Sequence, residues 1–133
     1  MSEKDTAQAG EHHTAQDVVL AHRVADGVTV VSLGGEIDAL NAYALARRLD
    51  ALTACPHLDL VLDLRPVTFI DCAGLGVLCR ARNRTRVRRG RLRLVAESAD
   101  FRRMLRITGL GDVFEVHERL PDPLPERAAG AAR

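Results

Sequence analysis

The sequence is poor in aromatic residues, with no tryptophan, one tyrosine and three phenylalanines among 133 residues. A core must therefore be built from Leu, Val, Ile and Ala. The chain also has few aromatic side chains on which the bases of a nucleic acid could stack. No apolar run approaches the ~20 residues that a membrane-spanning helix needs. The net charge of +1 predicts no overall attraction to nucleic acid or to a membrane surface. We therefore expect neither direct nucleic-acid binding nor a membrane span.

Cysteine is scarce as well, and the three cysteines form no recognisable framework. Cys55, Cys72 and Cys79 are an odd number, and their spacing fits no zinc-binding pattern. The N-terminal residues are polar and acidic, without the basic and apolar regions of a secretion signal. These features predict a cytoplasmic protein with reduced thiols and no cofactor.

Hydrophobic periodicity is confined to the middle of the chain. The length predicts one domain, and the periodic region places it over residues 18–119. Segments 1–17 and 120–133 show no such period, so we expect disorder at both ends.

Within this region the apolar period changes repeatedly between two and 3.6 residues. Strands are expected over residues 18–24, 28–33, 58–64, 91–96 and 113–117, the first two forming a hairpin across 25-ADG-27. Residues 58–64 alternate strictly, with four leucines on one face and Val61 on the other. Helices are expected over residues 42–54, 73–89 and 99–107. This order predicts an α/β fold: a single domain whose mixed β-sheet of about five strands packs against three or more helices.

The ends of the expected helices carry residues typical of caps. Asp38 or Asn41 is expected to cap the first helix, Asp71 the second and Ser98 the third. Gly90 is expected to stop the second helix.

The most informative stretch, 69-FIDCAGLG-76, joins an apolar strand and a Pro66 turn to the second helix. A short polar residue followed by small residues leaves backbone N–H groups free at a helix start and keeps bulk away from them. This corner predicts a site for an anion or for a polar group of a partner.

Three stretches in order resemble the STAS domain of bacterial anti-sigma factor antagonists. They are 34-GGEID-38, 58-LDLVLDLRPVTFIDCAGLGVL-78 and 90-GRLRLVAESADFRRMLRITGLGDVFEVH-117. The resemblance covers about residues 18–117 and implies a protein that regulates transcription by partner switching. Such an antagonist binds a kinase-type anti-sigma factor with a histidine-kinase-like ATPase fold, and the sigma factor is released. The kinase inactivates it by phosphorylating the serine after the aspartate of D-S-[ST]-G-L-G.

The resemblance also implies which residues bind the partner. Asp71 matches the motif aspartate, Cys72 the phospho-acceptor and Ala73 the second hydroxyl position. Glu36 and Asp38 match the acidic pair of the G-E-[LI]-D signature. The implied partner-binding set is Glu36, Asp38, Asp71, Cys72, Ala73, Gly74, Leu75 and Gly76. Since Cys72 and Ala73 lack hydroxyls, the resemblance implies an antagonist without the usual serine switch.

Other interpretations remain open from the sequence. STAS domains also serve as subunits of larger regulatory or transport assemblies. A Cys72-based redox-sensitive regulator is a second alternative, because a helix N-terminus stabilises a thiolate, but the adjacent Asp71 opposes that charge. Catalysis by Asp38 and Asp71 is not expected, because neither a pocket nor an activated nucleophile is indicated. A monomer or weak dimer is implied by the resemblance.

The sequence also contains a run of arginines, 80-RARNRTRVRRGRLR-93. Without interleaved aromatics, the run favours a solvated face that discriminates partners by charge over one that binds nucleic acid.

Overall fold

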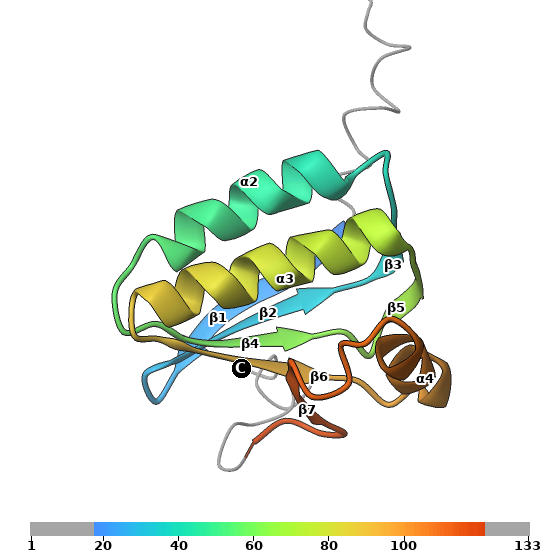
Figure 1. The fold of residues 1–133 in the computed structure, drawn as a ribbon. Helices are drawn as coiled ribbons and strands as arrows, with labels where there is room; N and C mark the ends of the chain where they lie inside the picture. The colour runs from blue at the N-terminus through green and yellow to red at the C-terminus, as the bar shows by residue number, and fades with distance from the viewer. Residues whose placement is uncertain (1–17, 122–133) are drawn as a thin grey trace, which may run out of the picture.

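In the computed structural model, which describes residues 18–121, five strands form a mixed sheet in the order β1-β2-β4-β6-β7 (Figure 1). The strands are β1 (Val19–Ala25), β2 (Val28–Leu33), β4 (Asp59–Asp63), β6 (Arg91–Val95) and β7 (Glu115–His117). β1 and β2 form the expected antiparallel hairpin, and Asp26 and Gly27 at its turn both have positive φ. The remaining neighbours pair in parallel. The predicted α/β fold is confirmed.

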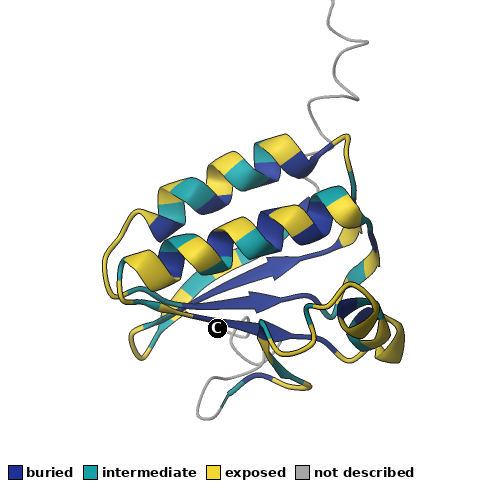
Figure 2. Cartoon of the chain, viewed as in Figure 1, coloured by how far each residue is buried: buried dark blue, intermediate teal, exposed yellow. Residues whose placement is uncertain are grey.

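The helices α2 (Ala42–Thr53) and α3 (Cys72–Val87) lie side by side over one face of this sheet, and α4 (Ala99–Ile107) lies beyond β5 (Figure 1). Strand β4 alternates as expected: Leu60 and Leu62, together with Leu64 just after the strand, belong to the core cluster beneath the helices. Val61 belongs to a second buried cluster on the other face. Figure 2 shows the central strands buried and the outer surfaces of the helices exposed.

A second, two-stranded sheet was not expected from the sequence. β3 (Gly35–Ile37) pairs in parallel with β5 (Val67–Ile70). Each strand is too short to show a period, and each follows a residue that breaks regular structure, Gly34 or Pro66. This small sheet brings the segment after Gly34 beside the segment that leads into α3.

The helix ends agree with the sequence at Asp71 and Ser98, whose side chains accept from Gly74 N–H at 3.0 Å and Phe101 N–H at 3.2 Å. Asn41, one of the two residues expected to cap the first helix, is the N-cap residue of α2, but its side chain makes no cap hydrogen bond. The other, Asp38, accepts at Oδ1 from Leu40 N–H, outside the helix.

The end of α3 also differs from the expectation. The left-handed residue is Arg89, with φ of 61°, and not Gly90. Gly90 donates its N–H to Thr85 O and lies against Leu58, the residue before β4, whose backbone oxygen a Cβ would overlap. Close packing, and not the turn itself, therefore requires this glycine.

The expected domain limits, residues 18 and 119, stay predictions. Disorder was expected over residues 1–17 and 120–133, and all of these except residues 120 and 121 lie outside the described residues. Leu120, just past the second limit, is buried against Val30, Val61 and Val95. Within residues 18–121, no helix is long and apolar enough to cross a membrane.

Candidate functional site

The N-terminus of α3 forms an exposed corner next to the small sheet. Asp71 is fixed on both sides: its N–H donates to Ile37 O at 3.2 Å, and its Oδ1 accepts from Gly74 N–H at 3.0 Å. The N–H groups of Cys72 and Ala73 have no acceptor among the described residues. Because a helix N-terminus carries partial positive charge, this corner can accept a polar or anionic group.

Gly74 and Gly76 differ sharply in their surroundings. A Cβ on Gly74 would lie 2.6 Å from Ile70 Cγ1 and 2.8 Å from Ile37 O, so glycine is needed for α3 to pack on β3. No atom lies within 4 Å of a Cβ built on Gly76, which is exposed. Packing therefore explains why residue 74 is a glycine, whereas the surface at Gly76 is open to a partner.

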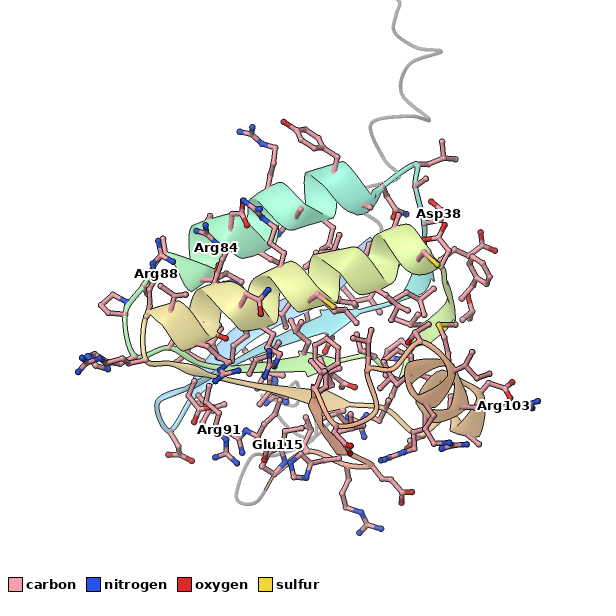
Figure 3. The ribbon with its side chains drawn as sticks, viewed as in Figure 1. Asp38, Arg84, Arg88, Arg91, Arg103 and Glu115 are labelled. Atoms are coloured by element: carbon pink, nitrogen blue, oxygen red, sulfur yellow. The ribbon has the colours of Figure 1, made fainter. Side chains whose placement is uncertain are left out.

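The acidic segment at the end of β3 is held against this corner. Glu36 is the register partner of Phe69, and Ile37 that of Ile70. The buried Asn41 accepts from Asp38 N–H at 3.0 Å and donates to Glu36 O at 2.7 Å. Figure 3 shows Asp38 beside the start of α3. The structure thus brings Glu36 and Asp38 to Asp71 through backbone pairing.

The eight residues of the implied binding set differ in accessibility. Six are at least partly exposed: Glu36, Asp38, Asp71, Cys72, Ala73 and Gly76. Gly74 and Leu75 are buried, with Leu75 in the core. The two buried residues place the others and present little surface themselves.

Three large apolar side chains around the corner were missing from the implied set. Leu40 is 87% exposed, Tyr43 74% and Phe69 51%. They come from the β3–α2 connection, the first turn of α2 and β5. One signal was present in the sequence, because Leu40 does not fit the apolar period of α2 (Ala42, Leu45, Leu49). Exposed aromatic and aliphatic residues near a polar corner are typical of protein-binding surfaces.

The chemistry available here is that of binding. The histidines of the described residues do not belong to this corner: His22 lies on β1, His57 follows α2, and His117 in β7 contacts Glu115. Over residues 18–121, no cluster of His, Cys, Asp and Glu could hold a metal ion. A shallow cavity of about 240 Å³ between β5 and α4 is lined largely by apolar residues, among them Phe69, Phe101 and Met104. Nothing in it pairs a nucleophile with a base.

The arginine run does not form a single patch, because its members serve different elements. Arg80 and Arg84 of α3 pair with Asp50 of α2, and the pKa of Asp50 is lowered chiefly by its hydrogen bond with Arg80. Arg91 and Arg93 instead join strands on the other side of the molecule, through Glu115 and Asp59.

Comparisons with known proteins agree on one family. Residues 20–122 match the family model of the STAS domain. The anti-sigma-F factor antagonist RsfB of Mycobacterium tuberculosis is 34% identical over 99 residues, which cover 74% of this chain and 80% of that protein. An anti-sigma-B factor antagonist of Listeria monocytogenes is 34% identical over 86 residues, covering 65% and 75%.

A solved structure agrees with these sequence matches. The crystal structure of an anti-sigma factor antagonist from Mycobacterium paratuberculosis has a TM-score of 0.68 to this chain at 34% identity. The superposition covers 80% of this chain and 91% of that one.

Proposed function

The chain belongs to the STAS domain family, and from that premise we propose that it is a cytoplasmic anti-sigma factor antagonist. It binds a kinase-type anti-sigma factor, and the sigma factor held by that protein is released. Two relatives at 34% identity bear the name of antagonist, and such proteins are regulators and not enzymes, as expected from the sequence. The observation that carries the proposal is the exposed corner at the start of α3 with its free N–H groups.

The corner offers three kinds of contact to the anti-sigma factor. The N–H groups of Cys72 and Ala73 can donate hydrogen bonds to a polar or anionic group of the partner, and Gly76 permits close approach of a backbone. The carboxylates of Glu36 and Asp38 attract a cation. The exposed Leu40, Tyr43 and Phe69 supply apolar area around these polar groups. Such a combination of aromatic anchors and a polar rim is what tight protein interfaces use.

The second part of the proposal is that this antagonist lacks a phosphorylation switch at its central site. Cys72 is exposed at the first position of α3, where the family has its acceptor serine. A phosphate there would add close to two negative charges beside Asp71. A thiol accepts no phosphate from a serine kinase, so the surface stays competent for binding. The nearest exposed hydroxyl along the chain is Thr68 on β5.

The test compares wild type, C72S and C72D against the kinase-type anti-sigma factors of the host. We expect wild type and C72S to bind alike, and C72D to bind at least about tenfold more weakly because its charge adds to that of Asp71. With ATP present, only C72S should take up phosphate, as read by intact-mass spectrometry.

Each contrary result has a definite meaning. Phosphate on wild-type protein, at residues 71–76 or at Thr68, would show that a switch is retained. Failure of all three proteins to bind any of these anti-sigma factors would reject the antagonist function in favour of a subunit of a larger assembly. Loss of binding by wild type but not by C72S after peroxide treatment would show that oxidation of Cys72 replaces phosphorylation.

A further inference from the structure

The outer surface of the two long helices carries positive charge that the described residues balance only in part. α3 contains four arginines and no acidic residue, and α2 contains two arginines and Asp50; Arg88 and Arg89 follow α3. Asp50 is shared by Arg80 and Arg84, at 2.8 Å and 3.3 Å. Within residues 18–121, no carboxylate forms an ion pair with the others, which are Arg47, Arg48, Arg82, Arg86, Arg88 and Arg89, although Arg47 also acts on Asp50 at longer range.

The arginines of α3 form two rows. Residues four apart lie above one another on a helix, so Arg80 and Arg84 form one row and Arg82 and Arg86 the other. The first row faces α2, where Arg84 also donates to Thr53 Oγ1 at 2.8 Å and to Asp50 O at 3.0 Å. Figure 3 shows Arg84 on this side of α3, with Arg88 beyond it.

Between the two rows lies a short uncharged line, Asn83 and Val87, which are four residues apart and both exposed, Val87 to 78%. Gly76, at the corner already described, is four residues before Arg80 and begins the row that faces α2. From Gly76 to Val87 the exposed surface of α3 is about 16 Å long at 1.5 Å per residue. The surface is therefore a narrow uncharged line with guanidinium groups on both sides.

We propose that this surface, the arginine face, docks an acidic segment of the anti-sigma factor, continuous with the contact at the α3 corner. The inference rests on the proposed function. Carboxylates suit the rows because a guanidinium binds a carboxylate with two parallel hydrogen bonds. Arg80 does so with Asp50 in this chain. Asp50 and Thr53 already hold Arg80 and Arg84 in place, so these two side chains lose less conformational freedom when a partner binds.

A protein segment fits the arginine face better than nucleic acid or lipid does. Stacking of bases needs aromatic side chains, but the exposed aromatics, Tyr43 and Phe69, belong to the corner at the other end of α3. The line through Val87 offers apolar contact that phosphate groups do not use. In a partner segment, apolar side chains would contact the uncharged line, and flanking Asp and Glu side chains would bind the two rows of arginines.

The experiment measures affinity for the host's kinase-type anti-sigma factor over a range of salt concentrations. The test variant is R82E/R86E, and the matched control is R103E/R106E on α4. Each pair reverses one charge in the body of a helix and one in its last turn. We expect the test variant to bind about tenfold or more weakly, with a shallower salt dependence, and the control to stay within about twofold of wild type. Circular dichroism confirms that both variants are folded.

The outcomes separate this inference from the proposed function. If R82E/R86E binds the anti-sigma factor normally while C72D does not, the arginine face is not a docking surface, and the proposed antagonist function is unaffected. If wild type binds no anti-sigma factor, the proposed function itself fails. If R82E/R86E instead loses binding only to a 30-nucleotide single-stranded RNA or to phosphatidylglycerol vesicles, the face serves another anion and the inference is wrong.

Discussion

At the scale of single residues, Gly74 and Gly76 show how a helix start can be both packed and open. The first lies against Ile37 and Ile70, where a Cβ would come within 2.8 Å of Ile37 O. The second faces solvent with no atom near. The motif alone does not distinguish them, because both are small residues in one short run.

Alanine substitutions should separate the two glycines. G74A should lower the free energy of unfolding by about 1–3 kcal/mol, because backbone and side chain must shift to admit the methyl group. G76A should leave it unchanged or raise it by up to about 1 kcal/mol, because alanine is the better helix former. Urea denaturation followed by circular dichroism measures both. Equal stability of the two variants would show that the packing of α3 on β3 tolerates a methyl group.

At the scale of elements, what could be predicted depended on whether a segment shows its own period. α2, α3 and α4 and the β1–β2 hairpin were predicted because their apolar residues repeat. β3 and β5 were not, because three or four residues after a Gly or Pro show no period, and only their mutual pairing makes them strands. The same pairing positions Glu36 and Asp38, whose place beside Asp71 only the family resemblance had implied. Asn41 stands at the N-cap of α2, but its side-chain amide binds Asp38 N–H and Glu36 O and not the helix.

The contact between β6 and β7 predicts an acid-dependent contribution to stability. Arg91 Nε donates to Glu115 Oε1 at 3.1 Å, and this hydrogen bond is the main reason that the pKa of Glu115 lies below its usual 4.5. A lowered carboxyl pKa means that its stabilising effect is complete above pH 4.5 and is lost as the pH falls through the folded-state value. Because Glu115 is 39% exposed, the effect should be under about 1 kcal/mol.

R91Q isolates this contribution. Without the guanidinium, the pKa of the Glu115 carboxyl should rise towards 4.5, as followed by NMR titration, and stability should fall less steeply in acid. The pKa of Asp50, which pairs with other arginines, serves as the internal control and should not move. An unchanged Glu115 pKa in R91Q would assign the shift to His117, which also contacts this carboxylate.

At the scale of the whole molecule, the sheet is buried on both faces by different parts of the chain. α2 and α3 cover one face, and on the other Val30, Val61 and Val95 form a small cluster with Leu120. The alternation of β4 predicted Val61 on the far face, but the sequence did not indicate what covers it. Leu120 was missed because it stands alone between charged residues and prolines, with no period to mark it.

Whether Leu120 belongs to the cooperative unit is decided by a matched pair of leucine substitutions. L120A removes a side chain that is 6% exposed, whereas L40A removes one that is 87% exposed. We expect L120A to lower the free energy of unfolding by about 2 kcal/mol, as for other buried leucines, and L40A to change it by less than about 0.5 kcal/mol. Urea midpoints at constant m-value measure both. Coincident midpoints would mean that the last residues separate before the sheet unfolds, and the domain would then end at residue 119.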